Sequence, residues 1–443
     1  MAVLDLGVDP RADYERKLST PEGAAAMVAS GDLVWIPSGQ IPPTILAALA
    51  KRESELRGVK VRSTMIPDFG WYRDEAREAF DLQIQYAIIP QNRQALAEGR
   101  ADFHPYHMIH QHKAIDTGRE EAQQIDDLML TVSPPNENGY VCVGHSCWDS
   151  VTTARRAKRV LVEVNDQQAR TRGDSWLHVS QIDAFVPYSR PPLPPLEELV
   201  AQPVDLAIAA HVKTLVHDGD TIQVGLGSHT GVLPRLGVFD ERQDLSYFGE
   251  LTVPGLVERV GRGNINGRGA MLHPGKFVAC YIGNSPEDLA VIDDNPAFEL
   301  HSSDYTNDPR VICRNENIVT MNGALMVDLT GQIGVYSIGP AIYTGLGGHL
   351  GFALGAALAP RGRAVTILPS TARGGSISTI VPQFDAGQLV SVPRELADTI
   401  VTEHGIARLL GRSVRERAEE LIRVADPSFR EELRFSARKL FYD

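Results

Sequence analysis

The chain has 443 residues, of which 43% are hydrophobic and 22% charged, so it is long enough for two or three globular domains. No apolar run reaches transmembrane length and the first residues lack the pattern of a secretory signal, so we expect a cytoplasmic protein that does not contact membranes. The net charge of −13 disfavours nucleic acid as a partner. The cysteines lack metal-ligand spacing; they are Cys142, Cys147, Cys280 and Cys313.

The first half alternates helical and strand-like segments. Residues 15–30 have helical spacing, and Gly31-Asp32 leads into a buried strand that ends before Gly39. A second helical pattern covers residues 45–51. Such alternation is typical of a largely parallel α/β sheet. Further strands are predicted at 59–63, 128–132 and 159–164.

Prolines crowd residues 187–203, where neither a helix nor a central strand can continue. We therefore predict an N-terminal α/β domain, a proline-rich linker and a C-terminal α/β domain. After the linker, Gly219-Asp220 precedes a strand and a glycine turn, as Gly31-Asp32 does in the first half. This repetition indicates two related α/β domains with largely parallel sheets. Their predicted bounds are 1–190, 191–204 for the linker, and 205–443.

One acidic residue of the C-terminal domain has a position suited to catalysis. The aromatic run 245–251 contains Gly249-Glu250, and a helical pattern follows at 253–260. Glu250 is thus predicted at a strand end, where α/β enzymes carry reactive groups and a carboxylate can act as a nucleophile. An ordinary surface acid would give the same pattern. Other strands are predicted at 222–224, 277–281, 311–313 and 364–368, and helices at 352–358 and 413–439, the latter divided at Pro427.

Three glycine-rich segments indicate a phosphate-bearing ligand. They cover residues 225–231, 345–351 and 368–376, and the third contains Arg373. Glycine lets the backbone approach a ligand, and N–H groups at a helix start favour anions. Arg373 could reach a phosphate as a guanidinium fork. The first segment lacks the Rossmann fingerprint, and ordinary tight turns are the alternative.

Several histidines lie close together in the sequence, as in some metal sites, but the other usual ligands form no matching pattern nearby. No acidic or cysteine pattern supports it, so we expect no metal and instead a histidine that lines a substrate pocket. The cluster comprises His104, His107, His110 and His112.

Ordered motifs along nearly the whole chain carry a family resemblance. They include Ser-Pro-Pro-Asn-Glu-Asn-Gly-Tyr at 133–140 and His-Pro-Gly-Lys at 273–276, with others at 98–102, 305–309, 327–332, 345–348, 370–372 and 401–405. With these motifs the chain resembles the acetyl-CoA hydrolase/transferase family, especially its 4-hydroxybutyrate (butyrate) CoA-transferase branch. The resemblance implies two α/β domains of the family I CoA-transferase type, with coenzyme A, the substrate, lying largely on the second.

The resemblance also implies roles for individual residues. Glu250 matches the catalytic glutamate, which would exchange CoA between an acyl-CoA and a small carboxylic acid through a glutamyl-CoA thioester, with ping-pong kinetics. A homodimer or higher homo-oligomer is implied as well. The residues expected to hold coenzyme A and the reaction's oxyanions are Gly225, Gly227, Gly345, Gly347, Gly348, Lys276 and Arg373.

The chain departs from the family pattern in four places. His349 and Gly351 replace a polar amide and an acid, Met326 replaces an acid, Thr379 replaces an arginine, and Gln168-Ala169 replaces Met-Pro. We therefore predict a remodelled, less polar acyl pocket formed by His349, Gly351 and Met326. It would take an acyl group bulkier than acetate that is branched, aromatic or carries a second carboxylate. The alternative is that these positions lie behind the pocket.

Two other functions fit the same sequence. An acyl-CoA hydrolase would use His349 or His229 to activate water. A non-catalytic acyl-CoA-binding subunit would account for the departures, although the retained Glu250 speaks against it.

Overall fold

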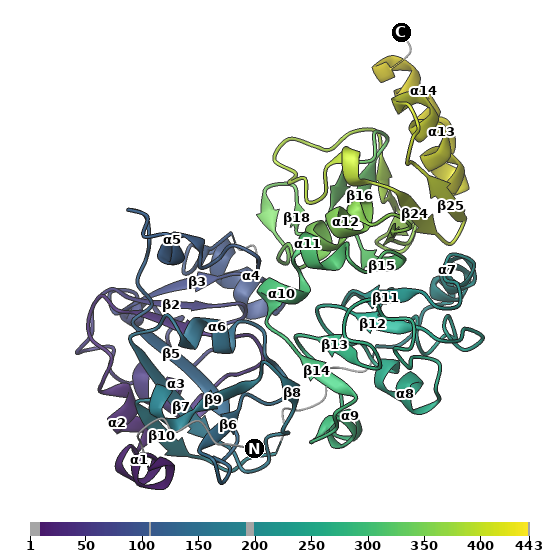
Figure 1. Ribbon diagram of the computed structural model, residues 1–443. Helices are drawn as coiled ribbons and strands as arrows, with labels where there is room; N and C mark the ends of the chain where they lie inside the picture. Colours follow the sequence, from purple (N-terminus) through teal and green to yellow (C-terminus); the bar gives the residue numbers. More distant parts are fainter. Residues whose placement is uncertain (1–8, 106–107, 192–198, 442–443) are drawn as a thin grey trace. The chain divides into compact units, whose positions relative to one another are not determined.

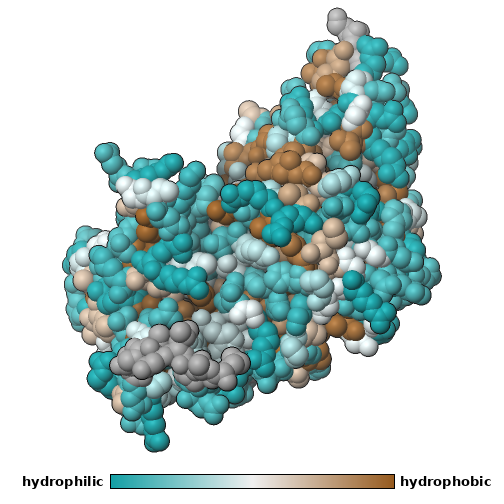
Figure 2. All heavy atoms as spheres, in the orientation of Figure 1, coloured by the Kyte–Doolittle hydropathy of each residue, from teal (hydrophilic) through white to brown (hydrophobic). Residues whose placement is uncertain are grey.

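In the computed structural model, residues 9–105, 108–191 and 199–441 are described, and the chain divides into two compact units (Figure 1). The first unit comprises residues 1–194, 280–282 and 289–304, and the second comprises 195–279, 283–288 and 305–443. Two short segments of the predicted C-terminal domain therefore group with the first unit. No described helix is long and apolar enough to cross a membrane. Polar residues predominate on the face drawn in Figure 2, as the composition implies.

The first unit is built on a parallel sheet with the strand order β10-β7-β5-β1-β2-β3-β4. Its central strands are buried along their length, so they are apolar on both faces, as sheets covered by helices are. The strands are β1 (Leu33–Ile36), β2 (Val59–Ser63), β3 (Phe80–Ile84), β4 (Asp102–Phe103), β5 (Asp127–Val132), β7 (Arg159–Val164) and β10 (Ala184–Pro187). Smaller pairings join β6 (Tyr140–Cys142) to β9 (Trp176–His178), and β8 (Arg172–Gly173) to β14 (Phe298–Leu300).

Several helices of the first unit begin with proline, which is pre-organised for the first helical turn and lacks an N–H to satisfy. They are α1 (Pro10–Arg16), α2 (Pro21–Ala25), α3 (Pro43–Ala50) and α4 (Pro90–Ala97), followed by α5 (Lys113–Asp116) and α6 (Ser150–Ala154).

The sheet of the second unit has the order β25-β24-β20-β15-β11-β12-β13, and only β25 is antiparallel to its neighbour among these strands. The strands are β11 (Thr221–Val224), β12 (Ser246–Phe248), β13 (Phe277–Ala279), β15 (Ile318–Gly323), β20 (Arg363–Ile367), β24 (Thr399–Thr402) and β25 (Gly405–Arg408). Small ladders are formed by β16 (Met326–Asp328), β17 (Ile333–Gly334) and β23 (Ile380–Val381), by β18 (Ser337–Ile338) and β19 (Ala341–Ile342), and by β21 (Thr371–Ala372) and β22 (Ile377–Ser378).

Helix α12 lies against β15 and β20, and the C-terminal pair α13 and α14 packs beside β25 (Figure 1). A capping box at Ser413 and Glu416 starts α13. The helices are α7 (Pro203–Lys213), α8 (Leu256–Gly261), α9 (Pro286–Ile292), α10 (Ser303–Thr306), α11 (Pro309–Ile312), α12 (His349–Leu358), α13 (Val414–Val424) and α14 (Arg430–Phe441).

The two units repeat one topology, which confirms the predicted α/β class and the relation between the halves. In the order β10-β7-β5-β1-β2-β3, each strand has a counterpart in β24-β20-β15-β11-β12-β13. One ion pair recurs at matching places: Arg159 on β7 binds Asp32 before β1 at 2.7 Å, and Arg363 on β20 binds Asp220 before β11 at 2.5 Å. The Gly-Asp echo in the sequence thus marks equivalent strands.

Some predicted elements were wrong. Residues 311–313 are not a strand, because Asp308 caps a helix that begins at Pro309 and accepts the Arg310 N–H. Among the strands that the prediction missed, β15 is a central one. Residues 15–30 form two short helices rather than one, since Thr20-Pro21 starts a second helix. Helix α7 already begins at Pro203, inside the predicted linker, of which residues 192–198 lie outside the described chain.

Candidate active site

Glu250 follows strand β12 at the carboxyl edge of the second sheet. The register pairs Ile222 of β11 with Tyr247 of β12, and Gly225 and Glu250 follow the ends of these neighbouring parallel strands. The Glu250 side chain is 9% exposed, and its Oε2 accepts a hydrogen bond of 2.7 Å from the Asn307 amide. A second hydrogen bond comes from the backbone of Gly348. Reactive groups of open α/β sheets collect at this edge.

The backbone around Gly348 is shaped to receive the carboxylate. Gly348 is the N-cap of α12, and Gly347 before it has φ of 60°, a left-handed conformation that favours glycine. A Cβ added at Gly348 would come within 2.2 Å of Glu250 Oε2 and 2.5 Å of the Asn307 amide nitrogen. The absence of a side chain at residue 348 is therefore what lets the carboxylate reach the start of α12, where N–H groups favour negative charge.

The pKa of Glu250 differs from that of an ordinary surface acid. Burial raises the pKa of the Glu250 carboxyl to about 7, although the hydrogen bonds from Asn307 and Gly348 lower it. A desolvated carboxylate that two donors keep partly ionised at neutral pH is a stronger nucleophile than one in water.

The proposed acyl-pocket residues have different surroundings. His349 is 7% exposed, and its Nε2 lies 3.3 Å from Thr366 Oγ1 on β20. Burial lowers the pKa of the His349 imidazole to about 4, so the ring is neutral. A Cβ at Gly351 would come within 2.7 Å of the backbone oxygen of Asn307, so Gly351 permits α12 to approach that segment. Met326 is half-buried on β16.

The expected coenzyme-binding residues fall on several loops of the second unit. Gly225 and Gly227 follow β11, and a Cβ at Gly225 would come within 2.5 Å of the Asn322 amide oxygen on β15. Gly345 is buried ahead of α12, and Lys276 directly precedes β13. Arg373 is exposed at the tip of the β21–β22 hairpin with φ of 49°. Of these residues, Gly348 lies against Glu250. The others lie on loops of the second unit.

The histidine cluster belongs to the first unit. His112 is 4% exposed and its Nε2 lies 3.0 Å from Thr153 Oγ1, while the backbone N–H of His104 bonds to Ile84. Burial lowers the pKa values of the His104 and His112 imidazoles to about 4. His110 is exposed, and His107 lies outside the described residues.

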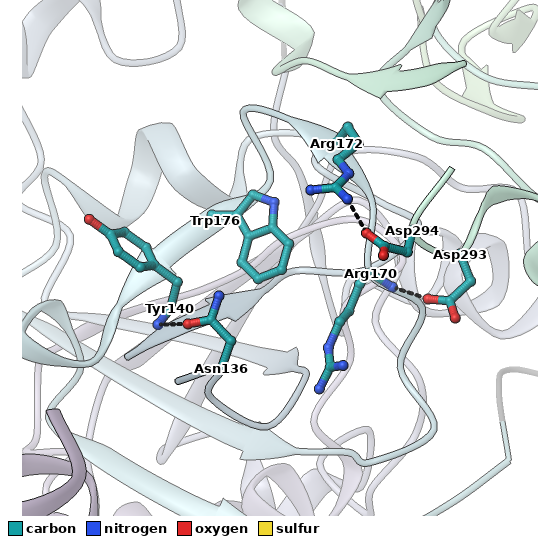
Figure 3. A pocket seen from close by; sticks show the side chains of 7 residues that line it. All are labelled: Asn136, Tyr140, Arg170, Arg172, Trp176, Asp293 and Asp294. Atoms are coloured by element: carbon teal, nitrogen blue, oxygen red, sulfur yellow. Dashed lines mark hydrogen bonds and ion pairs between the residues drawn. The ribbon is translucent and has the colours of Figure 1, made fainter. Parts of the chain in front are cut away.

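A separate cavity of about 600 Å³ lies on the first unit (Figure 3). Its two acids are already engaged, because Asp294 pairs with Arg172 and Asp293 accepts the backbone N–H of Arg170. The cavity contains none of the residues around Glu250. Its lining is Asn136, Tyr140, Arg170, Arg172, Trp176, Asp293 and Asp294.

Comparison with known proteins identifies the chain. The acetyl-CoA hydrolase/transferase N-terminal domain matches residues 2–197, and the C-terminal domain of the same family matches residues 286–437. The chain belongs to the acetyl-CoA hydrolase/transferase family. Within that family, a 4-hydroxybutyrate coenzyme A transferase of Clostridium kluyveri is 33% identical over 97% of this chain and 99% of its own. A succinyl-CoA:cyclohexane-1-carboxylate CoA transferase of Geobacter metallireducens is 32% identical over 97% of this chain and 96% of its own.

Solved structures agree with the assignment to the acetyl-CoA hydrolase/transferase family. RipA from Yersinia pestis superposes with a TM-score of 0.90 at 31% identity, covering 98% of this chain and 99% of that one. A 4-hydroxybutyrate CoA-transferase from Porphyromonas gingivalis gives 0.77 at 27% identity, covering 98% and 100%. With relatives of this kind along almost its whole length, the chain is a CoA-transferase.

The sequence did not predict Asn307 as a site residue. Asn307 lies in the motif at 305–309, but nothing in the sequence relates it to Glu250, which is 57 positions away. The two meet because Asn307 lies between α10 and α11, and this segment packs against α12. An asparagine next to a helix-capping Asp308 was the only local signal.

Proposed function

We propose that this protein exchanges coenzyme A between an acyl-CoA and a carboxylic acid, with Glu250 as the covalent nucleophile. The observation that carries the proposal is the buried Glu250 carboxylate, held by Asn307 and by the backbone of Gly348 at the start of α12. The proposed exchange of coenzyme A also agrees with the names of the CoA-transferase relatives.

The reaction proceeds in two halves. A Glu250 oxygen attacks the thioester carbon, the C–S bond breaks, and CoA leaves as its thiolate from a mixed anhydride. The thiolate then attacks the Glu250 carbonyl carbon, the C–O bond to the first acid breaks, and a glutamyl-CoA thioester remains. The acceptor carboxylate reverses both steps, so the thioester's free energy is retained and ping-pong kinetics follow.

Backbone donors near Gly347 and Gly348 are the groups proposed to stabilise the oxyanions. A donor of this kind contributes roughly 2.7–4 kcal/mol to lowering the barrier. Coenzyme A would also be held by the loops that contain Gly225, Gly227, Gly345, Lys276 and Arg373, and exclusion of water would protect the acyl intermediate.

For the acyl group we propose a branched or ring-bearing acid rather than acetate. His349 is buried and neutral, and Met326 offers an adaptable apolar surface, so neither adds a charge beside an acyl chain. The Geobacter metallireducens relative is named for a cyclohexane carboxylate. His349→Gln should change the order of preference in a panel of acyl-CoA donors, and an unchanged order with acetyl-CoA first would contradict the proposal. Gly351 is left intact there, since a side chain would meet the Asn307 backbone.

Mass spectrometry tests the central proposal. After incubation with acyl-CoA, digestion should yield the peptide containing Glu250 increased by the mass of CoA in thioester linkage, and borohydride should reduce that residue. Exchange without any adduct on Glu250 would overturn the covalent role. Rapid loss of acyl-CoA without an acceptor acid would instead favour a hydrolase. Sedimentation of the pure protein checks the predicted homodimer or larger homo-oligomer.

A further inference from the structure

A histidine and a buried acid form a pair on the second unit, away from Glu250 in the sequence. His229 lies in the loop after β11, and its Nδ1 is 2.6 Å from Oδ1 of Asp205 on α7. The Asp205 side chain is 1% exposed, whereas that of His229 is 25% exposed. The acid is therefore inside the protein and the imidazole reaches from it toward the surface.

The acid is fixed independently of the histidine. The other oxygen of Asp205, Oδ2, accepts the backbone N–H of Gln202 at 2.7 Å in the capping box of α7. Because both carboxylate oxygens are engaged, Asp205 holds the ring in one orientation with Nδ1 inward. Nε2 is then the ring atom left to face outward, and it has no hydrogen-bond partner among the described residues.

The loop that carries His229 leaves the sheet at its topological switch point. The chain passes from β11 to β12 in one direction along the sheet and from β15 to β20 in the other. Ligands of open α/β sheets bind in the crevice outside the carboxyl ends at such a point. Here the two loops are in close approach: a Cβ at Gly225 would come within 2.5 Å of Asn322, and one at Gly323 within 3.9 Å of Thr230 Oγ1.

His229 and Glu250 follow neighbouring strands of the second sheet, but they contact different helices. Right-handed crossovers that run in opposite directions along a sheet lie on opposite faces. Glu250 is directed to the start of α12, which belongs to the β15–β20 crossover, whereas His229 belongs to the β11–β12 connection. His229 and the Gly348 contact of Glu250 thus belong to connections on opposite faces of the sheet.

We propose that His229 binds a phosphate group of coenzyme A through Nε2, with Asp205 as a positioning residue. This rests on the proposed CoA-transferase function and deepens it. A protonated imidazole donates from both nitrogens, so one ring can bind the Asp205 carboxylate and a phosphate oxygen together. Charge-assisted hydrogen bonds of this kind are the strong ones, and phosphates are the charged groups of coenzyme A far from the thioester.

The decisive variant is His229→Asn. The asparagine amide nitrogen can take the place of Nδ1 and keep the bond to Asp205, while Nε2 is lost. Steady-state exchange should be measured with three donors that share one acyl group: the acyl-CoA, the acyl-3′-dephospho-CoA and the S-acyl-pantetheine. We expect the KM for acyl-CoA to rise roughly tenfold with kcat nearly unchanged. Calorimetric titration of the same variant with CoA alone gives the second measurement, with a Kd raised by a similar factor.

The three donors separate the outcomes. If the penalty vanishes with the dephospho donor, His229 binds the 3′-phosphate; if it vanishes only with the pantetheine, His229 binds the diphosphate. An equal penalty for all three donors would mean that His229 only fastens the loop, and an unchanged KM for acyl-CoA would mean no contact; either result overturns the proposal. Failure of the wild type to exchange any thioester would refute the proposed function instead, and is seen before the variant is made.

Discussion

Each unit buries a glutamate against the start of a helix, and the two glutamates differ in what surrounds them. Glu163 on β7 is fully buried, and its Oε1 accepts hydrogen bonds from Thr44 and from the Ile45 backbone at the start of α3. Glu250 accepts bonds from Asn307 and Gly348 at the start of α12. Glu163 lies within strand β7, one residue before its end, and caps the start of α3. Glu250 follows a strand at the sheet edge, where a ligand can reach it.

The two units share one sheet topology but differ in the loops around their buried glutamates. Both sheets share their strand order and the Asp–Arg pair that ties the first strand to a neighbour two strands away. A difference lies in the loop before α12, where the lack of a side chain at Gly348 leaves room for Glu250 Oε2. The shared scaffold supplies rigidity and the loops supply the chemistry.

Substitution of Glu250 should reduce activity far more than the same substitution of Glu163. Glu250→Gln removes the nucleophile and should lower CoA exchange by about 10⁴-fold or more, because no other group can form the thioester. Glu163→Gln is the matched control, an identical change at a buried acid of the other sheet, and should keep most of the activity. Thioester exchange followed by chromatography measures both. Equal losses in the two variants would mean that Glu250 matters only for folding.

The second largest effect should come from filling the space beside Gly348 at the start of α12. Gly348→Ala places a methyl group where Glu250 Oε2 and the Asn307 amide now lie, so the carboxylate must move. A displacement of about 1 Å can cost on the order of 10²-fold in rate. Gly261→Ala, with nothing within 4 Å of the added Cβ, is the control and should be nearly silent. The proposed site is wrong if both alanine variants exchange CoA at the wild-type rate.

Most of the architecture could be predicted, because periodicity and glycine turns are local signals. The strands at 59–63 and 159–164 have the expected bounds, and the Gly-Asp repeat reported equivalent strands. The failures have physical reasons. Residues 311–313 are apolar enough for a strand, but Asp308-Pro309 starts a helix there. The contacts of Glu250 with Asn307 and of His229 with Asp205 depend on the sheet order, which no short sequence window contains.

The pH dependence of stability should report the cost of burying the Glu250 carboxylate. The folded protein raises the pKa of Glu250 from 4.5 to about 7, so it favours the protonated form. The wild type therefore loses stability as pH rises from about 4.5 through about 7, by roughly 3 kcal/mol at pH 8. Glu250→Gln imitates the protonated acid and should be more stable than the wild type at pH 8 but equal to it at pH 4.

Removal of the Glu163 side chain in the first unit should destabilise the protein. Glu163→Ala leaves the N–H groups of Thr44 and Ile45 without their acceptor and should destabilise by about 1–3 kcal/mol. Urea unfolding at the two pH values measures both variants. A Glu250→Gln variant less stable than the wild type at pH 8 would contradict the strain assigned to the active site.

The smallest effect concerns the support of Glu250 by Asn307. Its amide donates to Oε2 at 2.7 Å and so lowers the pKa of the Glu250 carboxyl against the effect of burial. Asn307→Ala removes that donor, which should raise the pKa above about 7 and leave less carboxylate at neutral pH. Since only the ionised form attacks, the acid limb of the kcat/KM profile should move to higher pH, and exchange at pH 7 should fall roughly tenfold. At high pH most of the loss should be recovered, because Glu250 is then ionised in both proteins. Asn315→Ala removes another buried amide of the second unit and should leave the acid limb in place. If the Asn307 variant loses activity equally at every pH, then Asn307 positions the carboxylate without tuning its charge.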